Sequence, residues 1–353
     1  METKYIMKNF KNKKILITGH TGLKGSWLSL WLKYSGAKVY GISNNFNSTQ
    51  TNIKKFEIKK SVKNFNIDIR NLKKLSRAIN KIKPDYIFHF AAQSLVGASY
   101  KNPIYNFQTN FNGTLNILEI LRLSNFKCIS IIITSDKSYR NFEIKRGYVE
   151  EDILGGDDPY SASKASAEFV INSYFKSFLI NKKNIRIAVC RAGNVIGGGD
   201  WSKDRLIPDI MRAIFKKKKL KLRNQNSTRP WQHVLDVLNG YLILAIKLKK
   251  DKRLNGEVFN FGPSMLSNFS VLDVVREIKK NWNKLEWEFS NRTYHESTLL
   301  KLNSNKSFKY LKWRNKLSFQ ECIKLVTDWY KNSYEKKNIY NFSIKQIKYF
   351  EDK

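Results

Sequence analysis

The sequence predicts an α/β fold in which helices cover both faces of a doubly wound, parallel β-sheet. Three observations lead to this prediction. Short β-branched runs alternate with segments of helical periodicity, a glycine-rich turn joins the first strand to the first helix, and the uncharged run CISIIITS is typical of a strand buried on both faces. Ligands of such sheets bind outside the carboxyl ends of the strands.

The first strand and the first helix flank three glycines spaced three residues apart. Residues 13–18 form an apolar run typical of a buried strand, and we expect a helix to begin near Ser26. Gly19, Gly22 and Gly25 lie between them, where a helix N-terminus offers backbone N–H groups and a positive dipole to an anion. The turn therefore predicts a cradle for phosphate groups.

The alternation of strands and helices continues to residue 197. We expect strands over residues 37–43, 84–93, 128–135 and 185–197, and helices over residues 103–124 and 157–178. The second helix has a clear start, because Asp158 suits the N-cap and Pro159 suits the first turn.

Beyond residue 197 the pattern becomes irregular and mostly helical, with one strand expected over residues 257–263. We predict two interleaved parts: a nucleotide-binding domain over residues 1–192, which residues 233–265 rejoin, and a smaller, mostly helical substrate-binding domain over residues 193–232 and 266–353.

The formal net charge of +36 raises the question of nucleic-acid binding. Lysine is spread through every segment together with asparagine and isoleucine, which indicates a compositional bias of the whole chain. The densest cluster, residues 216–219, is short and typical of a solvated surface. We expect no nucleic-acid partner, although positive potential would help to attract a diphosphate substrate.

The three cysteines, Cys128, Cys190 and Cys322, are widely separated and show no metal-ligand spacing. Their odd number argues against a disulfide framework. Neither a signal peptide nor a membrane-spanning run is recognisable. We therefore expect a protein of the reducing cytoplasm, without a metal site or a membrane anchor.

Tyr160 and Lys164 are the first candidates for catalysis. They lie four residues apart on one predicted helix, so their side chains share a face. A lysine ammonium beside a phenol lowers the tyrosine pKa, which prepares Tyr160 to take a proton from a sugar or alcohol hydroxyl. Such a pair also occurs by chance, but here a glycine turn precedes it, and ITSDKSY ends a central strand nearby.

The chain resembles the extended short-chain dehydrogenase/reductase superfamily, and within it the nucleotide-sugar 4,6-dehydratases, above all those that act on CDP-glucose. The resemblance runs from about residue 13 to the end. It is carried by the segments TGHTGLKGSWL, HFAAQSLV, TSDKSY, PYSASKASAE, RAGNVIGGGDW, STRPWQHVLD and HESTLLKLN.

The resemblance implies a redox-neutral dehydration that yields a 4-keto-6-deoxyglucose still attached to CDP. Tyr160, activated by Lys164, would take the proton from O4, Ser135 would hydrogen-bond the O4 region, and Asp136 would be the acid at C6. Related enzymes carry a glutamate, the usual C5 base, where this chain has Lys137. Lys137 is a C5 base with a lowered pKa, a stabiliser of the enolate, or a bystander.

The resemblance also implies bound NAD. We expect the cofactor to contact Gly19, His20, Gly22, Leu23, Lys24, Gly25, Ser43, Asp68, Ile69, Ala91, Ala92, Gln93, Tyr160 and Lys164. Rossmann sites commonly place an acid after the second strand, and here Ser43 and Asn44 stand instead. With His20 and Lys24 as basic groups in the turn, charge alone would also allow NADP, whereas the resemblance favours NAD.

For the sugar nucleotide, the resemblance implies contacts from Ser94, Asn194, Arg205, Arg229, Arg292 and His295. Arginine suits a diphosphate because its planar fork can bind two oxygens at once. His233 is either part of this site or a core histidine.

The resemblance further implies a homodimer, in which the helices over residues 103–122 and 159–178 pair into a four-helix bundle, and a role in deoxysugar synthesis for lipopolysaccharide O-antigen. Three alternatives stay open: a dehydratase for another nucleotide sugar, a nucleotide-sugar 4-epimerase and a non-catalytic, nucleotide-sensing regulator. Asp136 favours dehydration over epimerisation, because epimerases lack an acid at this position.

Overall fold

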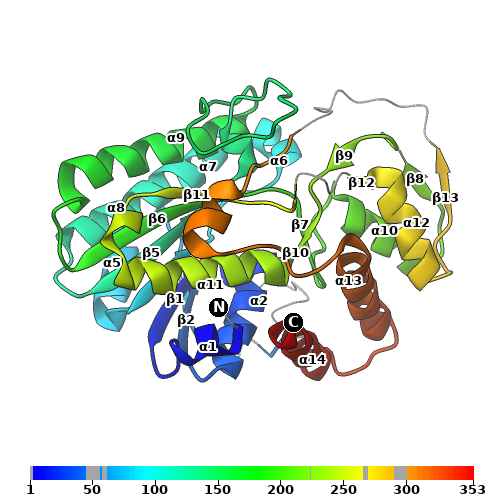
Figure 1. Cartoon of the computed structure of the whole chain (residues 1–353), viewed down its shortest axis with the longest axis horizontal. Helices are drawn as coiled ribbons and strands as arrows, with labels where there is room; N and C mark the ends of the chain where they lie inside the picture. Colours follow the sequence, from blue (N-terminus) through cyan, green and yellow to red (C-terminus); the bar gives the residue numbers. More distant parts are fainter. Residues whose placement is uncertain (1–2, 45–55, 58–61, 223, 265–268, 290–299) are drawn as a thin grey trace.

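The core of the molecule is a seven-stranded parallel sheet (Figure 1). The computed structural model describes residues 3–44, 56–57, 62–222, 224–264, 269–289 and 300–353. The strands lie in the order β11-β6-β5-β4-β1-β2-β3, and all neighbours are parallel. Their bounds are β1 Lys14–Thr18, β2 Lys38–Ser43, β3 Lys63–Asn66, β4 Tyr86–His89, β5 Cys128–Ile133, β6 Ile185–Ala192 and β11 Val258–Phe261. The predicted doubly wound sheet is confirmed.

The strand order reverses between β1 and β4. From β1 the chain moves outward through β2 and β3, then crosses to the other side of β1 to form β4. The two strands end level with each other, Thr18 beside His89, and Thr18 Oγ1 lies 2.7 Å from His89 Nδ1. A crevice at such a reversal is where open α/β sheets bind their ligands.

Helices cover both faces of this sheet (Figure 1). On one face lie α2 (Leu23–Tyr34) and α11 (Val234–Lys250). On the other lie α5 (Leu72–Ile82), α8 (Gly113–Leu123) and α9 (Pro159–Tyr174). Alternate residues of β5 divide between the two layers: Ile131 and Ile133 join the core under α2 and α11, and Ile132 joins the opposite core.

Three helices differ from their predicted course. The helix predicted over residues 157–178 runs as α9 and then as the π-helical turn η3 (Phe175–Leu179). α2 begins at Leu23, earlier than the predicted start near Ser26, because Gly22 takes the extended N-cap conformation and its carbonyl already accepts a hydrogen bond from Ser26 N at 2.9 Å. The predicted helix over residues 103–124 contains a π-helical turn, η1 (Gln108–Asn112), between α7 (Pro103–Phe107) and α8.

The remaining elements gather mainly beyond the carboxyl ends of β6 and β11 (Figure 1). The helices among them are α10 Leu206–Phe215, α12 Val271–Asn281, α13 Phe319–Tyr334 and α14 Ile339–Asp352. Three two-stranded sheets join β7 Val195–Ile196 to β10 Gln232–His233, β9 Thr228–Arg229 to β12 Phe269–Ser270, and β8 Leu220–Leu222 to β13 Trp287–Phe289. Short elements complete the description: α1 Thr3–Lys8, α6 Val96–Lys101, η2 Asp136–Ser138, η3 Phe175–Leu179, η4 Lys252–Leu254 and η5 Ser307–Leu311.

The last helix returns to the beginning of the chain. α14 packs against α1 and α2, and Trp31 Nε1 donates to Glu351 Oε1 at 2.7 Å. The sheet likewise takes in β11, from the second half of the sequence. The proposed division into a nucleotide-binding and a substrate-binding domain stays a prediction.

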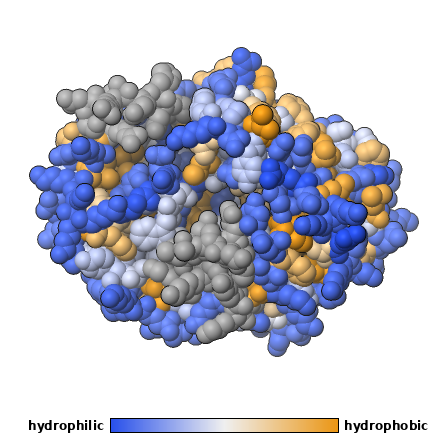
Figure 2. All heavy atoms as spheres, turned by 180° about the vertical axis from the view of Figure 1, so that it is seen from behind, coloured by the Kyte–Doolittle hydropathy of each residue, from blue (hydrophilic) through white to orange (hydrophobic). Residues whose placement is uncertain are grey.

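Hydrophilic side chains are spread over the face shown in Figure 2, with apolar residues between them. Among the helices that the structure describes, none combines the length and the apolar character needed to cross a bilayer.

Candidate active site

The segment after β5 carries three of the predicted catalytic residues. Ser135 caps the single turn η2, which contains Asp136 and Lys137. Asp136 Oδ1 accepts hydrogen bonds from Ser135 Oγ and from the backbone N–H of Lys137, both at 2.9 Å. Asp136 is buried, and Lys137 is half-buried. We call residues 135–137 the catalytic turn.

α9 brings Tyr160 and Lys164 beside this turn. Its start is as predicted: Asp158 accepts a hydrogen bond from Ser161 N at 3.0 Å, and Pro159 occupies the first turn. Tyr160 interacts with the Ser135 side chain, and Lys164 Nζ donates to the carbonyl of Ile133, the last residue of β5, at 3.4 Å. The side chains of Tyr160 and Lys164 on α9 therefore lie beside the residues that follow the carboxyl end of β5.

Burial governs the electrostatics of this pair. It raises the pKa of Tyr160 to about 12, although the hydrogen bond with Ser135 and the charge of Arg205 act in the opposite direction. Burial, reinforced by the nearby charge of Lys24, lowers the pKa of Lys164 to about 8. The expectation that the Tyr160 pKa falls below its ordinary value is therefore wrong for this geometry, because desolvation outweighs the nearby positive charge.

Asp136 has the properties of a general acid. Burial raises its pKa above the ordinary value, against the lowering effects of Lys137, Ser135 and Lys24. A buried carboxyl of this kind stays protonated to a higher pH than an exposed one. It can therefore donate a proton to a leaving group placed against it.

The glycine turn has the shape that its spacing predicts. Gly19 has a φ of +71°, and a Cβ there would lie 2.8 Å from the backbone nitrogen of Ala91. A Cβ on Gly25 would lie 2.2 Å from the carbonyl oxygen of Gly19. Gly22, the N-cap of α2, adds no side-chain acceptor for the first N–H groups of the helix. These features leave a helix start whose free N–H groups suit an anion, close to the carboxyl ends of β1 and β4.

The two basic residues of the turn behave differently. His20 is fully buried, a Cβ on Gly41 would lie 2.4 Å from its ring, and burial lowers its pKa to about 4. The expectation that His20 is a basic group in the turn is thus wrong, because it is neutral at physiological pH. Lys24 has a pKa lowered to about 8 by burial, and the charges of Asp136 and Arg205 act on it. Lys24 therefore lies close to the catalytic turn.

The end of β4 lies beside the end of β1. Ala91 N donates to Thr18 Oγ1 at 3.2 Å, and Ala92 and Gln93 follow, all three half-buried. Asn110 holds this segment: its side chain accepts from Gln93 N at 2.8 Å and donates to Gln93 O at 3.0 Å and to Ser163 Oγ at 2.8 Å. The sequence analysis missed Asn110, which lies in the π-helical turn that periodicity did not reveal.

At the end of β2, Ser43 Oγ lies 3.0 Å from Thr21 Oγ1. Asp68 is held by Arg70 through side-chain contacts of 2.7 to 3.1 Å, and these contacts hold its pKa below the ordinary value. Ile69 is buried against Gly113, where a Cβ would lie 2.3 Å from the isoleucine Cδ1. A pocket of about 450 Å³ opens here, lined by Asp68, Arg70, Asn71, Gln108 and Asn112.

Two residues predicted to contact the substrate meet across the fold. Arg205 donates to Ser94 Oγ at 3.2 Å and to Asp200 Oδ2 at 2.9 Å. Arg229 lies half-buried in β9 and donates to the carbonyl of Thr228. Asn194 lies just before β7 and is half-buried. Arg292 and His295 lie outside the described residues.

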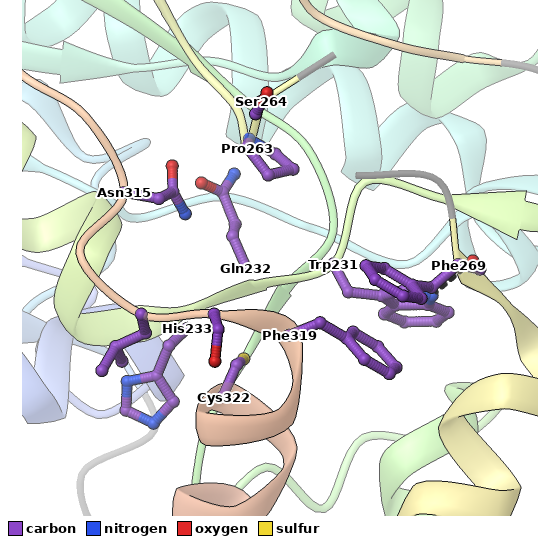
Figure 3. Close-up of a pocket in the computed structure, with 11 residues that line it drawn as sticks. Trp231, Gln232, His233, Pro263, Ser264, Phe269, Asn315, Phe319 and Cys322 are labelled. Carbon is purple, nitrogen blue, oxygen red and sulfur yellow. Dashed lines mark hydrogen bonds between the residues drawn. The ribbon is translucent and has the colours of Figure 1, made fainter. Parts of the chain in front are cut away.

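His233 is a core histidine. It is fully buried, its Nδ1 accepts from Leu235 N at 3.2 Å, and its ring lies 6.2 Å from that of Trp27. Figure 3 shows a cavity of about 140 Å³ between β10 and α13, with the His233 ring directed away from the Gln232 amide. None of the predicted catalytic residues lines this cavity.

Comparison with known proteins identifies relatives over almost the whole chain. The family model for GDP-mannose 4,6 dehydratase matches residues 16–326. CDP-glucose 4,6-dehydratase of Salmonella typhimurium is 39% identical over 334 residues, which cover 92% of this chain and 93% of the relative. CDP-paratose 2-epimerase of Salmonella typhi is 26% identical over 341 residues, covering 90% and 98%.

Solved structures share the fold. An epimerase from Methanothermobacter thermautotrophicus has a TM-score of 0.82 at 23% identity, covering 94% of this chain and 96% of its own. The dTDP-glucose 4,6-dehydratase of Bacillus anthracis, solved in complex with NAD, has a TM-score of 0.74 at 23% identity, covering 92% and 98%. The resemblance seen in the motifs is confirmed by these matches, and the chain belongs to the GDP-mannose 4,6 dehydratase family.

Proposed function

We propose that the protein is a hydro-lyase that converts CDP-glucose to CDP-4-keto-6-deoxyglucose and water. The observation that carries this proposal is the buried, hydrogen-bonded Asp136 beside Tyr160. Epimerisation at C4 needs no acid that expels a hydroxyl, whereas dehydration does. The 39% identity to the CDP-glucose enzyme of Salmonella typhimurium supports this choice of nucleotide.

The residues at the crevice fit a dinucleotide. The close approach of Gly19 to Ala91 and the start of α2 without a side-chain cap suit a diphosphate. We propose that the adenine end binds beside Asp68 and Ile69, where the pocket lined by Asp68 opens, and that residues 91–93 line the path of the nicotinamide. NAD, when bound, supplies the hydride acceptor at C4 and the hydride donor at C6.

The proton transfers belong to the chain's own residues. Tyr160 takes the proton from O4 in its phenolate form, and Ser135 holds the O4 region in place. Since burial raises the pKa of Tyr160 to about 12 in the free protein, this step requires that positive charge at the occupied site lower that pKa. Lys164 is proposed to activate Tyr160 by its positive charge, and its Nζ is directed to the end of β5, where it donates to Ile133 O at 3.4 Å. After C4 becomes a ketone, the C5 hydrogen is acidic, and its removal leaves an enolate. Asp136 then donates its proton to the C6 hydroxyl, which leaves as water and leaves a C5–C6 double bond. Hydride return to C6 and return of a proton to C5 would complete the 4-keto-6-deoxy sugar.

Lys137 is the base that removes the C5 proton, an ammonium that stabilises the enolate, or a bystander. Lys24 is a further cation close to Asp136 and Arg205. Both lysines add positive potential where negative charge develops during the elimination.

Arg205, Ser94, Asn194 and Arg229 are proposed to bind the nucleotide diphosphate and the sugar, with Arg292 and His295 from outside the described residues. The Arg205 guanidinium is already oriented, since its Nη1 donates to Asp200 and its Nη2 donates to Ser94. Orientation before binding reduces the entropy lost when the diphosphate is bound.

We infer a cytoplasmic homodimer with a role in deoxysugar synthesis for O-antigen. Large apolar side chains are exposed on α7 and α9: Ile104 is 71% exposed and Phe169 is 60% exposed. Exposed apolar surface of this kind is typical of an interface. In the proposed dimer these helices pair with the same helices of a second copy, as a four-helix bundle.

The proposal is tested by adding one nucleotide sugar at a time to a mixture of the purified protein and NAD⁺. The substrates compared are CDP-glucose, dTDP-glucose, UDP-glucose and GDP-mannose. We expect the fastest formation of a 4-keto-6-deoxy sugar from CDP-glucose, identified by mass and by its absorbance in alkali. Equal or faster turnover of another nucleotide sugar would contradict the substrate, a C4 epimer would indicate an epimerase, and no turnover would favour a sensing role.

A further inference from the structure

A buried ion pair lies directly behind the catalytic turn. Glu168 on α9 accepts hydrogen bonds from Arg191 on β6, with Arg191 Nε 2.9 Å from Glu168 Oε1. The two side chains are only 4% and 3% exposed. Removing two charges from water is costly, and a buried pair often stabilises a fold no better than apolar residues do. The pair therefore requires an explanation other than stability.

This pair contacts both ends of the catalytic turn. Thr134, the residue before Ser135, donates its hydroxyl to Glu168 Oε1 at 2.7 Å. Tyr139, which follows the turn, lies with its ring 4.4 Å from the guanidinium carbon of Arg191. The Tyr139 hydroxyl is itself fixed, because it donates to Asn260 Oδ1 at 2.9 Å.

The same pair is attached to the helix that carries the proton acceptor. Glu168 follows Lys164 by four residues and Tyr160 by eight, so the three side chains share one face of α9. The charge of Glu168 also raises the pKa of Lys164, against the effect of burial. The Glu168 carboxylate thus pairs with Arg191 on β6 and accepts a hydrogen bond from Thr134 after β5. It also acts by its charge on Lys164.

We propose that Glu168 and Arg191 are positioning residues that hold the catalytic turn against Tyr160 and Lys164, through Thr134 on one side and Tyr139 on the other. This inference rests on the proposed function, since it concerns the geometry of that reaction. The proton acceptor acts at O4 and the acid acts at the C6 hydroxyl of the same sugar, so their separation must be kept. A displacement of about 1 Å at a catalytic group can cost ~10²-fold in rate.

The sharpest test removes the Thr134 hydroxyl, which lies 2.7 Å from Glu168 Oε1 and 3.4 Å from Cys190 O, and leaves the ion pair intact. Thr134→Val deletes the hydroxyl that reaches Glu168, and Thr134→Ser keeps it. With CDP-glucose, we expect kcat of Thr134→Val to fall ~10- to 100-fold while KM stays within about twofold, because Arg205 and Arg229 are untouched. Thr134→Ser should restore most of kcat. The matched control is Thr327→Val, a buried threonine whose hydroxyl donates within its own helix α13.

A second measurement needs no turnover. In the double variant Glu168→Gln/Arg191→Met, both buried charges are removed together, which preserves folding better than the loss of one partner. We expect faster amide hydrogen exchange over residues 134–139 in this variant and in Thr134→Val, with exchange in α13 unchanged.

The outcomes distinguish a failure of the positioning role from a failure of the proposed function. If the parent protein dehydrates CDP-glucose and Thr134→Val matches its kcat, the positioning role is wrong while the proposed function stands. If the parent shows no turnover, the proposed function fails. The contact between Thr134 and Glu168 is then tested by hydrogen exchange alone. Unchanged exchange over residues 134–139 in both variants would overturn the inference.

Discussion

Replacing Asp136 with asparagine separates the oxidation of the sugar from the elimination of water. In the structure, Asp136 Oδ1 accepts hydrogen bonds from Ser135 Oγ and Lys137 N at 2.9 Å each. The amide oxygen of asparagine can accept both, so the shape of the turn should survive. Only the acidic proton is lost. Tyr160 and Lys164 are unchanged, and C4 oxidation should therefore still occur.

The expected magnitude follows from the role assigned to this proton. General acid catalysis contributes ~10²- to 10⁴-fold, which corresponds to about 3–5 kcal/mol of activation free energy. Dehydration by Asp136→Asn should fall by this factor. Burial raises the pKa of Asp136, so elimination by the parent should decline as the pH rises through that pKa, since a carboxylate cannot donate a proton. The asparagine variant should lack this decline.

A rapid-quench, single-turnover experiment with mass spectrometry distinguishes the steps. Asp136→Asn should accumulate a nucleotide sugar that has lost two hydrogens but no water, whereas Tyr160→Phe should leave the substrate unchanged. Asp209→Asn, on α10 and paired with Arg212, is the control for the same chemical change. If folded Asp136→Asn accumulates no oxidised sugar, Asp136 belongs to the oxidation step or to binding. Parent-like dehydration would remove it from the mechanism, and Lys137 would be tested next.

Three further predictions concern the turn, the core and the dimer. Gly25→Ala places a Cβ 2.2 Å from Gly19 O, so we expect the fold to lose about 1–3 kcal/mol of stability. We also expect NAD⁺ binding, measured by calorimetry, to be lost. Binding as tight as that of the parent would contradict the role of the turn. Burial raises the pKa of Asp236 from 3.8 to about 7, so its contribution to stability is present below pH 3.8 and lost as the pH rises through 7. Asp236→Asn should thus raise the unfolding free energy above pH 7, by up to about 4 kcal/mol, and show no such gain near pH 4 in denaturant titrations. Phe169 is 60% exposed on α9, and we expect Phe169→Asp to be a monomer in analytical ultracentrifugation. Phe289 is 58% exposed on β13, and Phe289→Asp, the control, should remain a dimer. A monomeric parent would refute the dimer.

Local spacing in the sequence was enough to predict the elements that carry the site. The glycines at positions 19, 22 and 25 predict the turn because backbone geometry there depends on residues close in sequence. Asp158 predicts the start of α9 by the same logic, and the four-residue interval then places Tyr160 and Lys164 on one face. The alternation of apolar strands and helices predicts the parallel sheet, since each element must bury its apolar side.

Tertiary packing decided the charges and the distant contacts. The pKa of Tyr160, Asp136 and His20 depends on burial, which no local pattern reports, and for Tyr160 and His20 burial reversed the expectation. Arg205 reaches Ser94 across 111 residues of sequence, a contact that exists only once the fold brings the two segments together. A side chain's neighbours within one helix follow from helical geometry, whereas its dielectric surroundings and its partners on other elements are set by how those elements pack.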